Sequence, residues 1–147
     1  MRYLADSNIL LRVSQTSDRH YFVVRRSLET LWSRGDELCY TSQNLAEFWN
    51  VCTRPATSRE GFGLSVAETD KRAKLIESRF TLLPDSKKVH DEWRRLIVAY
   101  SVEGVSVHDA RLVAAMVVHG VKNILSIDAP DFARYSVMIT ALHPNDV

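Results

Sequence analysis

Apolar and polar positions alternate along this chain in two different patterns. Short runs of mainly apolar residues predict β-strands at four places, namely 2–5, 37–41, 81–83 and 123–125. The longer segments between them carry apolar residues at the spacing of amphipathic helices. Because helices alternate with short apolar strands, the pattern predicts an α/β protein, a three-layer α/β/α sandwich with a central, mainly parallel sheet.

The predicted helices have recognisable ends. Ser42 and Ser65 are good N-cap residues, and Glu68 predicts a capping box with Ser65. Gly35 and Gly120 suit the left-handed position that follows the last turn of a helix. The helices are therefore predicted to run from Ser7 or Asn8 to Arg12 and over residues 20–33, 42–53, 65–80, 87–100 and 106–119.

Two further segments complete the chain. Residues 55–64 are irregular, and we interpret them as a mobile surface loop because helical patterns lie on both sides. Residues 136–141 predict a last strand at an edge of the sheet. A chain of 147 residues without internal repeats is long enough for one hydrophobic core, so we expect a single domain over residues 1–147.

The composition predicts an ordinary globular protein, with 46% hydrophobic and 25% charged residues. The longest apolar stretch, 112–118, is too short to cross a bilayer, and Asp6 interrupts any signal-peptide pattern. We therefore expect a cytoplasmic protein with no membrane partner. Cys39 and Cys52 lie in apolar patterns without a second nearby cysteine, so we expect buried thiols and no zinc site.

The net charge of +1 does not by itself indicate a nucleic-acid-binding protein, for which a clearly basic surface is usual. Basic residues nevertheless occur in clusters, at 25–26, 71–74, 87–88 and 94–95. If several acids gather in one cleft, the remaining surface is more basic than the total suggests. The overall charge is thus no evidence for or against nucleic-acid binding.

Four acidic residues each stand where a predicted strand ends or a helix begins. Asp6 follows the first strand, Glu47 lies in the helix after the second, Asp109 lies in a first helical turn, and Asp128 follows the strand at 123–125. Each has an ordinary local explanation, as an N-cap, a surface residue, a partner of the helix dipole or a turn residue. Ligands of open α/β sheets bind outside the carboxyl ends of the strands, however, so we expect these acids to approach one another.

Carboxylates in one pocket repel each other, which raises some of their pKa values. A hard divalent cation with oxygen ligands, Mg²⁺ or Mn²⁺, relieves this repulsion. One or two such ions can activate water, stabilise charge on phosphoryl oxygens and assist the leaving oxygen. The acids therefore favour metal-dependent hydrolysis of a phosphodiester.

Four short motifs follow one another along the chain, namely Asp6-Ser7-Asn8, Asn44-Leu45-Ala46-Glu47-Phe48 with Arg54-Pro55, Val107-His108-Asp109-Ala110, and Ser126-Ile127-Asp128 with Asp131-Phe132. In this order they resemble the motifs of PIN-domain nucleases, above all the VapC-type toxins of toxin–antitoxin pairs. The resemblance covers essentially the whole chain. It implies an α/β/α sandwich, Mg²⁺- or Mn²⁺-dependent ribonuclease activity on RNA, a homodimer and a cognate antitoxin protein.

Carried over residue by residue, the resemblance implies that Asp6, Glu47 and Asp109 are the three core acids and metal ligands. Asp128 matches the fourth acid, which is the most variable in the family. Asp131 is a rival for that role, because it follows in the same turn. These assignments require four residues far apart in the sequence to meet in the fold.

The same resemblance assigns supporting roles. Asn8 and Ser126 match polar positions that hold carboxylates or metal-bound water, and Ser126 stands where the family often has threonine. In the irregular loop, Arg54 and Arg59 are candidates for contacting RNA phosphates, a hypothesis from composition alone. His108 is either the first-turn residue of a helix or a general base beside the acids.

Two rival functions remain open. One is another Mg²⁺-dependent α/β protein, such as a phosphatase or a phosphoacceptor domain. A phosphatase of the haloacid dehalogenase type requires a second Asp two positions after the first, where this chain has Asn8. The other is a PIN-fold binding module without catalysis, against which the intact set of acids argues.

Overall fold

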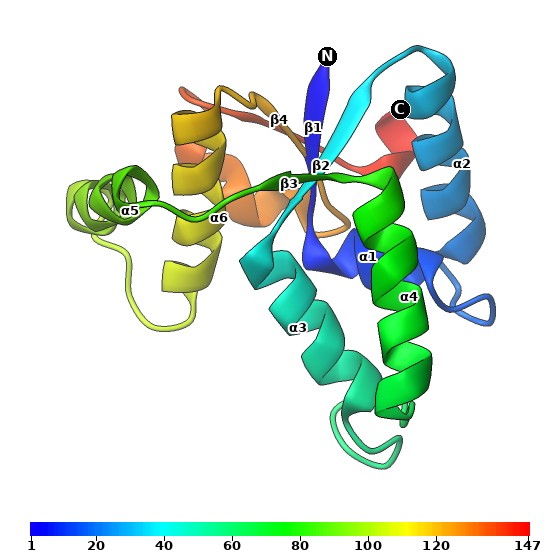
Figure 1. Ribbon diagram of the computed structural model, residues 1–147. Coiled ribbons are helices and arrows are strands. Elements are labelled where there is room, and N and C mark those ends of the chain that lie inside the picture. The colour runs from blue at the N-terminus through cyan, green and yellow to red at the C-terminus, as the bar shows by residue number, and fades with distance from the viewer.

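The centre of the molecule is a sheet of five parallel strands. The computed structural model describes residues 1–147, and the strands lie in the order β3-β2-β1-β4-β5. All four neighbouring pairs are parallel. The first strand of the chain is therefore the middle strand of the sheet (Figure 1). The bounds are β1 Arg2–Ala5, β2 Glu37–Thr41, β3 Thr81–Leu83, β4 Asn123–Leu125 and β5 Thr140–Leu142.

Helices cover both faces of this sheet. Figure 1 shows α5 and α6 on one side and α1, α2 and α4 on the other, while α3 extends away from the carboxyl edge of the strands. This arrangement confirms the predicted α/β/α sandwich, with a sheet that is parallel throughout. The helices are α1 Ser7–Val13, α2 Tyr21–Ser33, α3 Ser42–Thr53, α4 Val66–Arg79, α5 Lys87–Ala99 and α6 Ser106–His119, with short 3₁₀ helices η1 at Ala129–Tyr135 and η2 at Pro144–Asp146.

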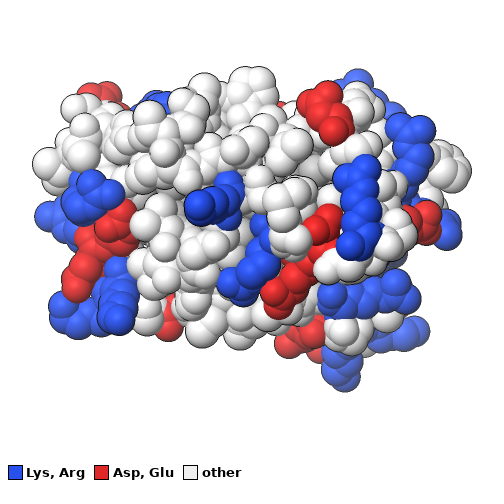
Figure 2. Space-filling view, turned by 90° about the horizontal axis from the view of Figure 1, so that it is seen from above, with Lys and Arg blue, Asp and Glu red and all other residues white.

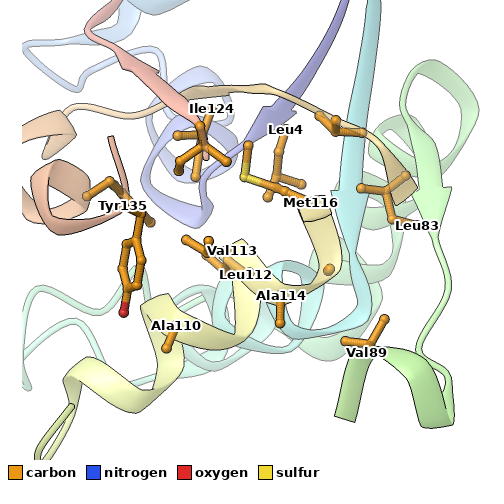
Figure 3. Packing of buried hydrophobic residues seen from close by; sticks show 14 of the residues in the cluster. Leu4, Leu83, Val89, Ala110, Leu112, Val113, Ala114, Met116, Ile124 and Tyr135 are labelled. Carbon is orange, nitrogen blue, oxygen red and sulfur yellow. The ribbon is translucent and has the colours of Figure 1, made fainter. Parts of the chain in front are cut away.

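Two buried clusters hold the layers together, one on each face of the sheet. Successive residues of a strand point to opposite faces, so Leu4 packs with residues of α5 and α6, while Tyr3 and Ala5 pack with residues of α1 to α4. Figure 3 shows Val113 and Met116 of α6 directed toward Leu4. Because α6 is fixed to the sheet by fully buried side chains, the position of its first turn at the carboxyl edge is fixed as well.

The predicted helices are found with each end within one residue, but one of them is capped by a different residue than expected. Asp6 caps α1, which is the local role considered for it above, and Thr41 in place of Ser42 caps α3. Both capping residues have extended backbone angles, so each helix begins only after them. Because Asp6 caps the helix, the hydroxyl of Ser7 is free to donate a hydrogen bond to Glu47.

The first turn of α4 forms half of the predicted capping box. The Ser65 hydroxyl accepts a hydrogen bond from the Glu68 amide at 3.1 Å, as expected. The Glu68 carboxylate instead pairs with Arg72, one turn further along the helix, at 3.5 Å. The helix start is thus set by Ser65.

The last strand was predicted too early in the chain. It spans Thr140–Leu142 at the edge of the sheet, and the preceding segment is the 3₁₀ helix η1, which the pattern did not indicate. The amides of Met138 and Ile139 donate back to the Tyr135 carbonyl at 2.9 and 3.0 Å. These bonds continue the turn, so pairing with β4 begins only at Thr140.

The irregular loop folds back on the end of α3. The amide of Phe62 donates to the Val51 carbonyl at 3.0 Å, and that of Gly63 donates to the Arg54 carbonyl at 2.8 Å. A Cβ at Gly61 would lie 2.5 Å from the Arg54 carbonyl oxygen, so only glycine fits there. The segment is therefore a loop with defined backbone contacts.

Two expectations about the whole chain concern membranes and thiols. None of the helices is both long and apolar enough to cross a membrane.

Cys39 and Cys52 are buried and unpaired, which confirms the expected thiols. Burial raises the pKa of both, that of Cys52 to about 11.

Candidate active site

Asp6 lies at the centre of the carboxyl edge of the sheet. Its amide donates to the Leu125 carbonyl at 3.0 Å, which extends the pairing of β1 with β4 by one residue. Its Oδ1 accepts a hydrogen bond from the Ser7 amide at 2.7 Å, so the residue is the N-cap of α1. Asp6 is only 9% exposed, and its carboxylate has a fixed orientation.

The second carboxylate oxygen of Asp6 accepts two side-chain hydrogen bonds. Ser126 Oγ donates to Oδ2 at 2.7 Å, and Asn8 Nδ2 lies 3.2 Å away. The same amide nitrogen lies 3.1 Å from Ser126 Oγ and 3.2 Å from Oδ2 of Asp128. The two hydrogens of the Asn8 amide are therefore shared among three acceptor oxygens. Asn8 and Ser126 thus hold Asp6 and connect it to Asp128, at the positions where the sequence predicted supporting residues.

Glu47 points into this cluster from the second turn of α3. Its Oε2 accepts a hydrogen bond from Ser7 Oγ at 2.5 Å, and its Oε1 accepts one from Gln43 Nε2 at 3.0 Å. Ser7 Oγ in turn accepts a hydrogen bond from Asn44 Nδ2 at 3.1 Å. The Glu47 carboxylate is therefore fixed between two helices and does not project into solvent.

A capping box at the start of α3 positions these contacts. The Asn44 amide donates to Thr41 Oγ1 at 3.1 Å, while Asn44 Oδ1 accepts from the Thr41 amide at 2.9 Å and from its hydroxyl at 2.8 Å. Asn44 is fully buried, and its Nδ2 remains for Ser7. The local start of α3 thus orients the hydroxyl that holds Glu47.

Asp109 joins the cluster from the first turn of α6. Gln43 Nε2 donates to the His108 carbonyl at 2.9 Å as well as to Glu47, and so connects α3 with α6. The pKa of Asp109 is raised to about 6, mainly by burial and in addition by the negative charges of Asp131 and Glu47. Asp109 therefore lies in the electrostatic field of the other acids.

The pKa of Asp6 is raised by burial and by the same neighbouring acids. The pKa is raised from an ordinary 3.8 to about 6, mainly by burial, although hydrogen bonds from Ser126 and the Ser7 amide favour the ionised form. The negative charges of Asp109 and Glu47 contribute to this rise. Glu47 thus contributes to the raised pKa of both aspartates, so the structure places the three predicted core acids within electrostatic reach of one another.

Asp128 and its rival Asp131 approach the cluster in different ways. Asp128 is exposed and connects to Asp6 through the Asn8 amide. Asp131 is also exposed, and its charge raises the pKa of Asp109 more than that of Asp128 does. Asp128 thus lies on the side of Asp6 and Asp131 affects Asp109 more strongly, so the choice of fourth acid stays a prediction.

No acid of this cluster is paired with a cation. The ion pairs of the chain include none of the four predicted acids and not Asp131. Near the amino ends of the strands, by contrast, Asp36 and Glu37 pair with the N-terminus and Arg2. Figure 2 views the molecule from this opposite edge, where Lys and Arg are spread with Asp and Glu among them.

The two arginines predicted to contact substrate lie away from the acids. Arg54 ends α3, and its guanidinium donates to the Arg59 carbonyl at 2.9 Å, within the irregular loop. Seven residues separate Glu47 from Arg54, which corresponds to about 10 Å along a helix. Substrate contact by Arg54 and Arg59 therefore stays a prediction, and Arg54 has a structural role in this loop.

The donor set suits a hard divalent cation. Asp6, Glu47 and Asp109 offer only carboxylate oxygens, which Mg²⁺ and Mn²⁺ prefer, and none of the three is paired with a cation. Asp6 and Glu47 are oriented by their hydrogen-bond donors. In these orientations no three acidic, histidine or cysteine side chains meet closely enough to enclose an ion. The acids thus lie near one another without forming a closed ligand shell.

Three residues of the cluster received no role from the sequence, namely Ser7, Gln43 and Asn44, although Ser7 and Asn44 stand in the motifs quoted above. One sign was present for Gln43, since it stands four positions before Glu47 on the same face of a helix. Its second partner, the His108 carbonyl, is 65 positions away and could not be inferred. Sequence analysis found the acids and missed the side chains that orient Glu47.

The sequence profile of the PIN domain family matches residues 3–137. The chain belongs to the PIN domain family. The matched region contains all four predicted acids as well as Asn8 and Ser126. No curated protein sequence matches this PIN domain.

Solved structures with a similar fold come from toxin–antitoxin systems. VapBC-1 from nontypeable Haemophilus influenzae has a TM-score of 0.70 and 13% identity over 99% of both chains. Mycobacterium tuberculosis VapC20, a sarcin-ricin loop cleaving toxin, has a TM-score of 0.68 and 16% identity over 90% of this chain and 94% of its own. A toxin–antitoxin complex from Klebsiella pneumoniae has a TM-score of 0.67 and 18% identity over 97% of each chain. At these identities the likeness establishes a shared fold, which confirms the fold expected from the motifs.

Proposed function

We propose that this PIN domain is a metal-dependent endoribonuclease and the toxin of a toxin–antitoxin pair. The observation that carries the proposal is the cluster of unpaired carboxylates, in which burial and neighbouring acids raise the pKa of Asp6 and Asp109 to about 6. Membership of the PIN family supports nuclease activity. The similar fold of VapC20, named as a toxin that cleaves the sarcin-ricin loop, supports RNA as the substrate.

Asp6, Glu47 and Asp109 would hold Mg²⁺ or Mn²⁺, with Asp128 as the fourth acid. When bound, such an ion supplies a Lewis acid that activates water and neutralises charge on the phosphoryl group. Ser126 and Asn8 keep the Asp6 carboxylate aimed at the cluster. The amino end of α6 places the positive end of its dipole there, which favours an anionic phosphodiester.

Ser7 and Gln43 position Glu47, each through one carboxylate oxygen. Such outer contacts typically change metal affinity or activity by about 10- to 100-fold when they are removed. The side chains around the acids thus act by orienting ligands, and the acids act on the ion and the attacking water. Asp128 stays the fourth acid of the proposal, with Asp131 as its neighbour on the side of Asp109.

The partners of this PIN domain follow from the same proposal. The complexes of similar fold from Haemophilus influenzae and Klebsiella pneumoniae are toxin–antitoxin assemblies, which supports a cognate antitoxin protein as partner. We further propose that the chain forms a homodimer and acts on RNA in the cytoplasm. Size-exclusion chromatography with light scattering would give the oligomeric state directly.

An RNA-cleavage assay tests the proposed activity. Wild-type protein is incubated with RNA and Mg²⁺, Mn²⁺ or a chelator, beside Asp6→Asn and Asp109→Asn. We expect cleavage with either ion, none with the chelator, and a loss of about 100-fold or more in each variant. Asp70→Asn, a matched change on the exposed side of α4, should cleave like wild type.

Two results would contradict the proposal in different ways. Full cleavage by both site variants would show that the acids of this cluster are not the catalytic ones. Hydrolysis of phosphomonoesters without RNA cleavage would identify a phosphatase, which is the main rival function.

A further inference from the structure

A hollow of about 330 Å³ lies between α5 and the first turn of α6, and nothing in the cluster of acids uses it. We call it the α5–α6 pocket; its walls include Ser86, His90, Trp93, Val107, His108 and Arg111. Figure 1 shows these two helices side by side at one end of the sheet. The volume is at the small end of the range of about 300–1,000 Å³ for ligand sites, enough for one nucleotide but not for a folded partner.

The pocket shares a wall with the acid cluster. His108 lines it, and the carbonyl of the same residue accepts the hydrogen bond from Gln43, which also holds Glu47. Asp109 follows directly in the chain, so only the first turn of α6 separates the acids from the pocket. That separation is about 10 Å, the diameter of one helix.

Two aromatic side chains form a fixed wall of the pocket. Trp93 Nε1 donates to the Val107 carbonyl at 2.9 Å, which holds the indole ring against the start of α6. The His90 ring lies 5.9 Å from the Trp93 ring, at an interplanar angle of 54°. Aromatic faces of this kind stack on unpaired bases in single-stranded nucleic acid, largely irrespective of sequence.

The same pocket holds one guanidinium, that of Arg111, which pairs with Asp85 in the pocket wall. An RNA phosphate approaching four carboxylates is repelled by them, so a cation nearby is needed to attract the strand. Arg111 stands at the rim, 45% exposed, and its guanidinium lies 3.3 Å from Asp85. A pair as exposed as this one is weak, so the guanidinium can exchange Asp85 for a phosphate.

We infer that the α5–α6 pocket binds one nucleotide of single-stranded RNA beside the bond that is cut. The base stacks on the exposed His90 ring beside Trp93, and its phosphate contacts Arg111. This inference rests on the proposed ribonuclease function, and it adds a determinant of where the RNA is cut. Because the pocket holds an unpaired base, it favours RNA that is single-stranded or looped at the cleavage site.

RNA binding measured under conditions that prevent cleavage tests the pocket separately from the ribonuclease activity. The probe is a fluorescein-labelled, eight-nucleotide single-stranded RNA of random sequence, titrated by anisotropy in a chelator with His90→Ala, Arg111→Ala and wild type. We expect Kd to rise about tenfold in each variant, the loss typical of one stacking or charge contact. Arg94→Ala serves as the control, because this exposed arginine of α5 lies outside the pocket.

A second measurement uses cleavage of a randomised RNA pool with Mn²⁺, followed by sequencing of the ends. We expect wild type to cut preferentially where the nucleotide beside the cut is unpaired, and we expect His90→Ala and Arg111→Ala to weaken this preference and to raise KM at nearly constant kcat. If the site variants Asp6→Asn and Asp109→Asn abolish cleavage while the pocket variants keep the wild-type Kd, KM and preference, the pocket inference is wrong and the nuclease stands.

RNA binding without RNA cleavage would separate the pocket from the proposed ribonuclease activity. Wild type that binds RNA through His90 and Arg111 without cleaving it would overturn the proposed function and keep the pocket as an RNA site. Unchanged RNA binding with a loss of self-association in the same variants would make the pocket a contact between protein chains and overturn the inference. Because both side chains are exposed, their removal should leave the fold intact, which circular dichroism can check.

Discussion

At the scale of single residues, Asp6 shows how one side chain serves the fold and the site together. One carboxylate oxygen caps α1 through the Ser7 amide, and the other accepts hydrogen bonds from Ser126 and Asn8. Sequence reasoning treated capping and chemistry as alternatives for Asp6. They are compatible because a carboxylate has two oxygens and the helix uses only one.

The raised pKa of Asp6 predicts how stability depends on pH in the absence of metal. Between about pH 4 and pH 6 the folded chain holds a proton on Asp6 that the unfolded chain has released, so the free energy of unfolding falls as the pH rises. The buried carboxylate then destabilises the fold at pH 7 by about 3 kcal/mol. Asp6→Asn should therefore raise Tm at pH 7 by about 10 °C and have little effect at pH 4.

Thermal unfolding in a chelator at both pH values measures this difference. Asp70→Asn provides the matched control, since its exposed partner Lys74 makes only a surface pair. A lower Tm for Asp6→Asn at pH 7 would show that the capping contact outweighs the buried charge, and our account of the pKa would then fail.

At the scale of elements, the helix ends were predictable and the contacts between helices were not. Apolar spacing and capping residues are local, so the bounds of α3 and α6 follow from the sequence alone. The meeting of Asp6, Glu47 and Asp109 also follows, because parallel strands end at one edge of the sheet. The bridge from Gln43 to the His108 carbonyl does not, since residue types carry no information about a backbone acceptor 65 positions away.

Gln43→Ala tests the role of this bridge. Removing the amide frees the Glu47 carboxylate and releases α6 from α3, so we expect kcat to fall about tenfold and the Mn²⁺ concentration for half-maximal activity to rise. The melting temperature should change little, because Gln43 Oε1 is buried without a partner and its loss offsets the two lost hydrogen bonds.

Asn50→Ala, on the exposed side of the same helix, is the control for Gln43→Ala. Comparing metal titrations of the two variants separates positioning from a general loosening of α3. Wild-type kcat and metal dependence in Gln43→Ala would remove Gln43 from the account.

At the scale of the whole molecule, the acids of the cluster differ from those at the other edge of the sheet in having no ion-pair partner. The cluster of acids has no ion pair, whereas acids near the other edge, such as Asp36, are paired. The net charge of +1 hides this separation, which is why composition alone did not indicate a nuclease. The single domain over residues 1–147 and the homodimer stay predictions.

Divalent cations should therefore stabilise the folded chain. An ion at 100 times its Kd that binds only the folded state adds about 2.7 kcal/mol, so Mn²⁺ should raise Tm by several degrees in one cooperative transition. Asp109→Asn should abolish most of this increase, and differential scanning calorimetry measures it. An equal increase in Asp109→Asn would place the stabilising ion elsewhere.

The central claim is that Asp6, Glu47, Asp109 and Asp128 hold one divalent-metal site at the carboxyl edge of the sheet. A crystal structure with Mn²⁺, recorded at a wavelength where manganese scatters anomalously, tests it most directly. We predict an anomalous peak about 2.1 Å from carboxylate oxygens of Asp6 and Asp109, beside Glu47. A Mn²⁺ peak away from these acids would contradict the account.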